Sequence, residues 1–201
     1  MNLRSLALLG GAAALLGGCN FAPVPDPSVS KKDAQFLALV PKAQVEMQFE
    51  RYRVDDPTGE PPGTIIVDTH DNYLYFVEPG RKAIRYGVAT GQEAYGWTGV
   101  AKVGRMAEWP HWMPPADMLK RWPHLQPTAN AGGLPGGPDN PLGARALYLY
   151  SGNRDTLYRI HGTNEPEKIG RGVSSGCIRM RDIDVIDLYN RVKVGTKVVV
   201  K

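Results

Sequence analysis

The sequence has few of the residues on which metal sites depend. Its 201 residues include only two cysteines, Cys19 and Cys177, and four histidines. No cysteine pair has the close spacing of a structural zinc site, and His111 and His124 lie in a stretch rich in tryptophan and proline. A zinc site built on Cys177 would lack paired ligands, so we expect no metal.

Long apolar runs are also scarce, and the strongest one lies at the N-terminus. Arg4 is followed by an apolar run over residues 6–16, which is too short to span a bilayer but has the length of a signal-peptide core. The run ends in Leu16-Gly17-Gly18-Cys19, which resembles a bacterial lipobox, in which the cysteine is lipidated and becomes the new N-terminus. Ordinary signal cleavage nearby is the alternative.

This N-terminus predicts a protein of the cell envelope. We expect residues 1–18 to be a signal peptide and Cys19 to be the lipidation site, so that a lipid anchor holds a periplasm-facing domain on a membrane. Asn20 does not match the common Asp retention signal, which favours the outer membrane. With Cys19 lipidated, Cys177 remains a lone thiol in an oxidising compartment, where a free thiol is a liability unless it is buried or used.

The charge balance points weakly to a partner. A net charge of +4 and a pI near 9.1 suit an anionic envelope polymer or membrane surface, although such a charge can also serve solubility alone. No run of Lys and Arg forms a nucleic-acid groove, and no recognition motif for nucleic acid is present. We therefore expect no nucleic-acid partner.

The chain divides at Gly63. Residues 19–62 are expected to form a tether, rich in Pro and Ser over 20–32, and a preceding segment of uncertain structure. Residues 63–201 are expected to form a mainly β domain, because short runs rich in Val, Ile and Tyr recur between turn signals. These runs are 64–68, 73–79, 83–91, 146–150, 157–162 and 196–201, and a helix with Asp182 as its N-cap is expected before the last of them.

A long irregular stretch is predicted between these strands, over residues 105–143. It contains eight prolines and three of the four tryptophans: Trp109, Trp112 and Trp122. Loops of this length in a compact domain are usually functional, so the stretch is a candidate lid or cleft wall whose tryptophans stack on sugars. The alternative is a structural flap pinned by its tryptophans.

The residues that carry chemistry are His161 and Cys177, sixteen positions apart and each beside a glycine. A thiol is a weak nucleophile until it is ionised, and a neighbouring imidazole can take its proton or hold it as a thiolate–imidazolium pair. The imidazole needs a third group to fix its tautomer, for which a backbone carbonyl suffices. Gly176 leaves space for a substrate carbonyl, and the amides around Cys177 are candidates for an oxyanion hole.

Taken together, IHGTNEP, IG, VSSGCIRM, DIDVIDLY and VKVGTKVVV resemble the catalytic domain of the L,D-transpeptidases, the YkuD-type bacterial peptidoglycan enzymes. The resemblance covers about residues 63–201, and NPLGAR at 140–145 also resembles the stretch ahead of the family's catalytic strands. It implies a β-sandwich-like domain with one or two helices and no cofactor. The motif's second His is Ser175 here, which leaves the details of acceptor binding open.

The resemblance also implies roles for individual residues. Cys177 would be the nucleophile, His161 its base, and the Gly162 carbonyl would orient the ring. The amides of Gly176 and Cys177 would form the oxyanion hole. The residues expected to contact substrate are Arg179, Ser174, Ser175 and Asn164; Arg179 could otherwise be a plain surface charge.

The implied reaction is acyl transfer on peptidoglycan stem peptides. Cys177 would attack the bond between diaminopimelate and a terminal D-Ala, release D-Ala and form a thioester. An amine of a second stem or of a protein would then take the acyl group. Two alternatives remain open: a hydrolase on the same scaffold, acting as an L,D-carboxypeptidase or amidase, and a non-catalytic wall-binding lipoprotein.

Overall fold

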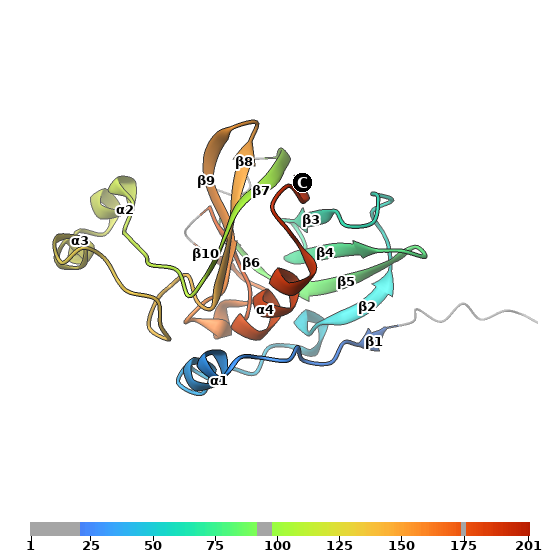
Figure 1. Ribbon diagram of the computed structural model, residues 1–201, viewed down its shortest axis with the longest axis horizontal. Helices are drawn as coiled ribbons and strands as arrows, with labels where there is room; N and C mark the ends of the chain where they lie inside the picture. The colour runs from blue at the N-terminus through green and yellow to red at the C-terminus, as the bar shows by residue number, and fades with distance from the viewer. Residues whose placement is uncertain (1–20, 92–97, 174–175) are drawn as a thin grey trace, which may run out of the picture.

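The structure, a computed structural model, describes residues 21–91, 98–173 and 176–201. The strands in these ranges join in one twelve-stranded sheet of order β1-β2-β5-β4-β3-β12-β7-β8-β9-β11-β6-β10. This confirms the mainly β fold with few helices (Figure 1). The strands are β1 Ala22–Pro23, β2 Tyr52–Asp55, β3 Ile65–Asp68, β4 Tyr73–Glu78, β5 Lys82–Gly87, β6 Ala89–Gly91, β7 Gly99–Glu108, β8 Arg145–Ser151, β9 Arg154–His161, β10 Gly172–Val173, β11 Ile178–Arg179 and β12 Lys197–Val200.

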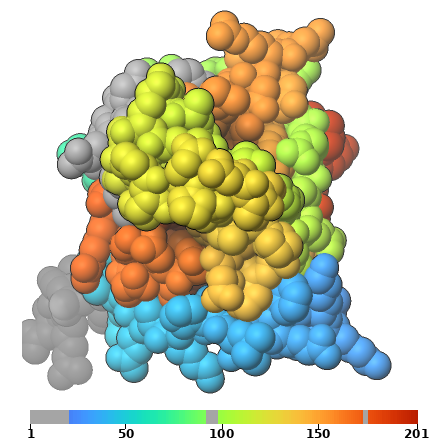
Figure 2. Space-filling model, turned by 90° about the vertical axis from the view of Figure 1, so that its left-hand side faces the viewer, coloured from blue at the N-terminus to red at the C-terminus, as the bar shows by residue number. Residues whose placement is uncertain are grey.

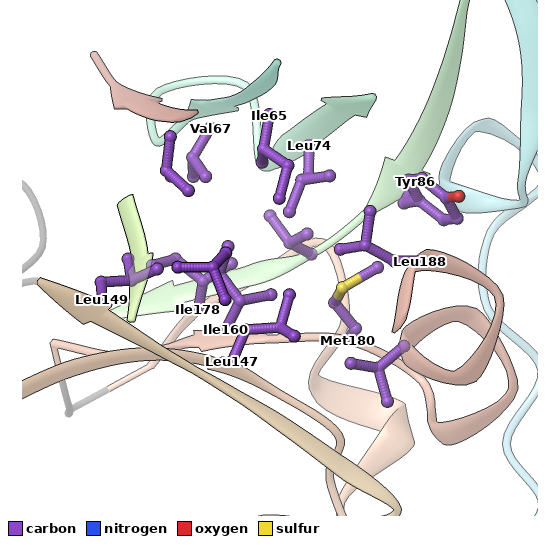
Figure 3. Close-up of a cluster of buried hydrophobic side chains, with 14 of the residues drawn as sticks. Ile65, Val67, Leu74, Tyr86, Leu147, Leu149, Ile160, Ile178, Met180 and Leu188 are labelled. Atoms are coloured by element: carbon purple, nitrogen blue, oxygen red, sulfur yellow. The ribbon is translucent and has the colours of Figure 1, made fainter. Parts of the chain in front are cut away.

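The sheet bends over, so that its two halves enclose the core. Strands β2 to β5 form one layer and β7 to β9 the other (Figure 1). Strand β12 lies between them in the network, parallel to β3 and antiparallel to β7. Figure 3 shows side chains of the two layers pointing at one another across the core, where these residues are fully buried: Ile65, Val67, Leu74, Leu147, Leu149, Ile160 and Ile178. Removal of this apolar surface from water drives the layers together.

Helix α4, Asp182–Arg191, packs against β8 and β9 and closes one end of this core. It buries Val185, Ile186 and Leu188, and the Tyr86 hydroxyl donates to the Asp187 carboxylate at 2.6 Å. The prediction of Asp182 as N-cap is wrong by one residue. Arg181 holds that position without a side-chain cap, and the Asp182 carboxylate is turned to other partners, described below.

The N-terminal segment lies on the domain from Ala22 onward instead of extending away from it. Strand β1 pairs with β2, and β2 pairs with β5 at the edge of the sheet. Buried Arg51 reaches Asp26 at 2.8 Å and Asp184 on α4 at 2.8 Å. Figure 2 shows this segment in blue and cyan as a band along one side of the molecule. Proline-rich composition predicts extended backbone, but it does not show whether that backbone is packed.

Helix α1, Lys31–Leu37, fixes this band to strand β8. It begins with a capping box between Ser30 and Asp33. Asp33 is buried and accepts two hydrogen bonds from Arg145 of β8, both at 2.9 Å, and one from the Trp109 indole at 2.8 Å. Burial alone would raise the pKa of Asp33, but these hydrogen bonds and that of Ser30 hold it well below its usual value.

The stretch predicted to be irregular from residue 105 begins as a strand, because β7 continues to Glu108. Residues 109–143, here called the flap, then carry α2 (Ala116–Arg121) and α3 (Gln126–Asn130), which project from the domain (Figure 1). The backbones of Trp112 and Leu134 bond to each other at 2.9 and 2.8 Å and close the base of the flap. Neither helix has a buried residue.

Trp109 does not wall a cleft, contrary to the hypothesis for all three tryptophans. It is 5% exposed, and Phe36 of α1 packs edge-on against its ring with centroids 4.8 Å apart. This tryptophan pins the flap to the core. The described residues also contain the 3-10 turns η1 Met47–Phe49, η3 Pro123–Leu125 and η4 Pro166–Lys168. No helix in the described ranges is long and apolar enough to cross a membrane.

Candidate active site

His161 and Cys177 are brought together by two parallel strands. His161 is the last residue of β9, and β11 runs alongside with Ile178 beside Ile160 and Arg179 beside His161. Ile160 and Ile178 point into the core. Side chains alternate along a strand, so His161, Arg179 and Cys177 face away from the core on the same side. His161 and Cys177, sixteen positions apart in the sequence, thus lie on one face of the sheet.

The His161 ring is held in a single tautomer. Its Nδ1 lies 2.6 Å from the carbonyl oxygen of Gly162, and the ring is buried. A carbonyl only accepts, so Nδ1 carries the proton and Nε2 keeps a lone pair. This is the arrangement that a general base needs, and the orienting group is the backbone carbonyl of Gly162.

The resting pair is neutral. Burial, with the positive charge of Arg179, lowers the pKa of His161 to about 3. Burial raises the pKa of the Cys177 thiol, although a backbone hydrogen bond from Arg159 and the charges of Arg159 and Arg179 oppose it. At neutral pH the site therefore holds a thiol beside an imidazole. Of the two states that the sequence left open, this favours proton transfer during attack over a preformed thiolate–imidazolium pair.

Asp182 fixes the backbone that carries the Gly162 carbonyl. Its Oδ1 accepts from the amides of Ala144 at 2.8 Å and Thr163 at 3.1 Å. A Cβ at Gly143 or Gly162 would collide with this carboxylate oxygen, so both positions require glycine. The carboxylate thus ties the turn after His161 to the turn before β8. Sequence reasoning missed this role because the partners lie 38 and 19 residues away.

Gly176, predicted from the sequence to give a substrate access to the thiol, is needed for packing. A Cβ there would lie 2.8 Å from the ring of Tyr158 on β9. The ring therefore fills the place of a side chain beside Cys177, which is itself half-buried. The oxyanion hole at the amides of Gly176 and Cys177 stays a prediction. Ser174 and Ser175 lie outside the described residues.

Both of the other residues expected to contact substrate are engaged within the protein. Arg179 donates to Glu165 at 2.9 Å, and Glu165 also pairs with Lys168. The Asn164 side chain donates to the carbonyl of Asp139 at 3.1 Å and so joins the site to the flap. Glu165, an acidic group beside the site, was not predicted. Substrate contact by Arg179 and Asn164 stays a prediction.

The described residues contain no group of three or more His, Cys, Asp or Glu side chains that could hold a metal ion. His111 and His124 are both exposed on the flap.

The model of the L,D-transpeptidase catalytic domain (YkuD) matches residues 62–200, which include both strands of the site and α4. The chain belongs to the L,D-transpeptidase catalytic-domain family.

Curated relatives of this L,D-transpeptidase domain carry the same family name. "Probable L,D-transpeptidase ErfK/SrfK" of Salmonella typhimurium is 35% identical over 139 residues, which is 67% of this chain and 42% of the relative. "Probable L,D-transpeptidase YbiS" of Escherichia coli K12 is 36% identical over 139 residues, which is 67% of this chain and 43% of the relative. The chain therefore spans less than half the length of these relatives.

A solved structure covers more of the L,D-transpeptidase chain. The crystal structure named "Probable carnitine operon oxidoreductase caia", from Brucella melitensis, is 46% identical, with a TM-score of 0.53. The match covers 78% of this chain and 96% of that one. The likeness therefore includes part of the sequence ahead of residue 62, where β1, β2 and α1 lie. The family assignment rests on the family model and the curated relatives.

Proposed function

We propose that this chain is a cysteine-dependent acyltransferase that acts on peptidoglycan stem peptides, with Cys177 as nucleophile and His161 as base. The observation that carries the proposal is the 2.6 Å hydrogen bond from His161 Nδ1 to the Gly162 carbonyl. It supports a ring whose free Nε2 can accept the thiol proton. Membership of the L,D-transpeptidase family supports the substrate class.

In the first step the Cys177 proton passes to His161 Nε2 as the sulfur attacks the carbonyl carbon of the diaminopimelyl–D-Ala bond. Because the thiol and the imidazole are neutral at rest, charge develops only as this bond forms. The tetrahedral intermediate collapses, the amine of D-Ala takes the proton from His161, and a thioester remains. The proposed donors to the developing oxyanion are the amides of Gly176 and Cys177.

In the second step an acceptor amine gives a proton to His161 Nε2 and attacks the thioester. The new amide forms, and the departing sulfur recovers the proton as the Cys177 thiol. A second stem gives a crosslink between two diaminopimelates, whereas a protein amine gives a wall-anchored protein. Water in place of the amine would make the chain a carboxypeptidase.

We further propose that the chain is a lipoprotein of the cell envelope, anchored through Cys19 with its domain facing the periplasm. The support is the apolar run over residues 6–16 and the Leu-Gly-Gly-Cys sequence that ends it. Cys19 lies outside the described residues. Metabolic labelling with a fatty-acid analogue should mark the wild-type chain and fail to mark Cys19→Ala; equal labelling of both would contradict the anchor.

The deciding experiment is mass spectrometry of products from a purified disaccharide-tetrapeptide, with the full chain in detergent and Cys177→Ala alongside. We expect a transient adduct on Cys177 and a crosslinked dimer that lacks one D-Ala, both absent with the variant. A monomer shortened by D-Ala without dimer would favour the hydrolase or a protein acceptor. No adduct and no product would leave the wall-binding lipoprotein in front.

A further inference from the structure

A row of side chains leads away from Cys177 across the sheet. Cys177 precedes Ile178, whose partner is Ile160, so it lies beside Arg159 of β9, and a backbone hydrogen bond joins the two. Arg159 pairs with Tyr148 of β8, and Tyr148 pairs with Arg105 of β7. The neighbours of Tyr148 along β8, Leu147 and Leu149, are buried in the core. Tyr148 and Arg159 therefore face away from the core, on the same side as the thiol.

Both arginines of the row stack on one aromatic ring. The guanidinium carbon of Arg105 lies 3.4 Å from the centroid of the Tyr148 ring, and that of Arg159 lies 4.4 Å from it. Stacking of this kind attracts the cation to the ring face and restricts the planar guanidinium to a few orientations. The two forks of hydrogen-bond donors are thus held in place before any ligand arrives.

The two arginines differ in their partners. Arg159 donates to both oxygens of Asp155, at 2.7 and 2.9 Å. Arg105 is exposed, and in the described ranges no hydrogen bond or ion pair to its guanidinium is found. On the other flank of Cys177, Arg179 is matched by Glu165 at 2.9 Å. Arg105 is therefore the arginine of this row whose guanidinium N–H donors can all turn to a ligand.

The distance from the thiol suits a peptide substrate. Neighbouring strands lie about 4.8 Å apart, so the backbone of Arg105 is roughly 14 Å from that of Cys177, three strands away. A peptide extends about 3.3–3.6 Å per residue, and an arginine side chain reaches back over part of that distance. A carboxylate two to four residues from the attacked bond would meet the guanidinium fork.

We propose that Arg105, held by Tyr148 and Arg159, forms a subsite for a carboxylate of the donor stem on the far side of diaminopimelate from D-Ala. The proposal rests on the proposed function, because it takes the acyl donor to be a stem peptide bound across β9, β8 and β7. A planar carboxylate accepts two parallel hydrogen bonds from a guanidinium, which an amide cannot do. The subsite therefore distinguishes a stem with a free carboxylate two residues from the attacked bond from one in which that carboxylate is amidated.

The test compares binding of these two stems by calorimetry in the Cys177→Ala full-length protein, so that no reaction is needed. The carboxylate stem should bind about tenfold more tightly than the carboxamide stem, the effect of charge-assisted bonds to one group. Arg105→Gln should reduce this ratio to about one. Arg154→Gln is the matched control, because it removes an exposed arginine at the tip of the neighbouring β8–β9 hairpin. This variant should leave the ratio of the two affinities unchanged.

Equal affinities for the two stems, a ratio that survives Arg105→Gln, or binding of neither stem would each overturn the subsite. The proposed function is judged separately, by the thioester on Cys177 of otherwise wild-type protein. Stems that show the carboxylate preference without forming a thioester would contradict the acyltransferase and leave the subsite supported. Stems that form the thioester but show no carboxylate preference would support the acyltransferase and contradict the subsite.

Discussion

Replacement of Asp182 by Asn should make the protein more stable at neutral pH, although it alters a carboxylate that holds two backbone amides. Asp182 is 5% exposed, and its Oδ2 has no hydrogen-bond partner in the described part of the chain. Burial raises the pKa of this carboxyl to about 6, despite the amides of Ala144 and Thr163 and the charge of Arg145. Asp33 adds to the increase, since its negative charge disfavours a second one nearby.

The sign and the size of the change in unfolding free energy follow from the linkage between protonation and folding. A carboxyl whose pKa is higher in the folded state contributes stability that is complete below 3.8, its unfolded value, and lost as the pH rises through about 6. The loss at pH 7.5 is about 3 kcal/mol, at about 1.4 kcal/mol for each tenfold change in proton affinity. Asn keeps an acceptor for both amides, but its NH2 group has no partner, which costs about 1–2 kcal/mol. A net gain of about 1–2 kcal/mol is expected.

The assay is urea unfolding of wild type and Asp182→Asn at pH 4 and pH 7.5, followed by tryptophan fluorescence. Between these pH values the stability of the variant relative to wild type should rise by about 2–3 kcal/mol. Asp187→Asn on the same helix is the matched control. Hydrogen bonds from Arg191 and Tyr86 hold the pKa of Asp187 below its usual value of 3.8 against the effect of burial, so its linked change in stability lies mostly below pH 4. The relative stability of that variant should therefore change little between pH 4 and pH 7.5. A stability difference for Asp182→Asn that does not change with pH would refute the reasoning.

Three further predictions concern the buried ion pair of Asp33 with Arg145, the Cys177 thiol and the glycine beside it. Asp33→Ala removes the buried partner of Arg145, which then keeps only the exposed Glu108 at 3.9 Å, and should cost about 3–5 kcal/mol in urea unfolding. A chain cut to residues 62–201, which lacks α1, should fail to fold cooperatively; a stable truncated chain would contradict this. Iodoacetamide should label Cys177 more slowly than a free thiol at pH 7, because burial raises the pKa of the thiol; faster labelling would show a preformed thiolate. Gly176→Ala should lower turnover at least tenfold, because its Cβ would meet the Tyr158 ring at 2.8 Å, and Tyr158→Leu should recover part of the loss; turnover equal to wild type in the single variant would contradict the packing argument.

The chemistry-bearing residues could be predicted because their signal is local in sequence. His161 lies at the end of a run that was predicted to be a strand, and Cys177 lies beside Gly176 in a short polar motif. The strand that follows Cys177, β11, was not predicted, and its parallel pairing with β9 places the two residues on one face. The mainly β fold was likewise readable from runs of Val, Ile and Tyr. Strand β7 as a whole was not predicted, and its end was assigned to the irregular stretch because Met106, Ala107 and Glu108 have weak strand preference and adjoin the Trp- and Pro-rich flap.

The supporting charges were beyond sequence reasoning. Asp33 and Arg145 are 112 residues apart, and Arg51 and Asp184 are 133 residues apart. Charged residues are usually exposed, so nothing in their local sequence marks these four as buried. Their pairing becomes visible only when the fold has brought α1, β8 and α4 together. The burial of Trp109 was also not predictable from its local sequence. The Trp- and Pro-rich stretch around it suggested a cleft wall, whereas the fold makes Trp109 part of the core.

If Cys19 carries a lipid, the packing of residues 22–55 on the domain limits the distance between the membrane and the domain. Only three peptide units separate Cys19 from Ala22, where the packed strand β1 begins, and they span at most about 10 Å. The connection between the lipid and the domain is therefore short. The proline-rich residues after Ala22 do not lengthen it, because they are packed on the domain. If the proposed lipid anchor and the proposed action on peptidoglycan both hold, the domain would work on the polymer next to its own membrane, within a distance set by the size of the folded domain.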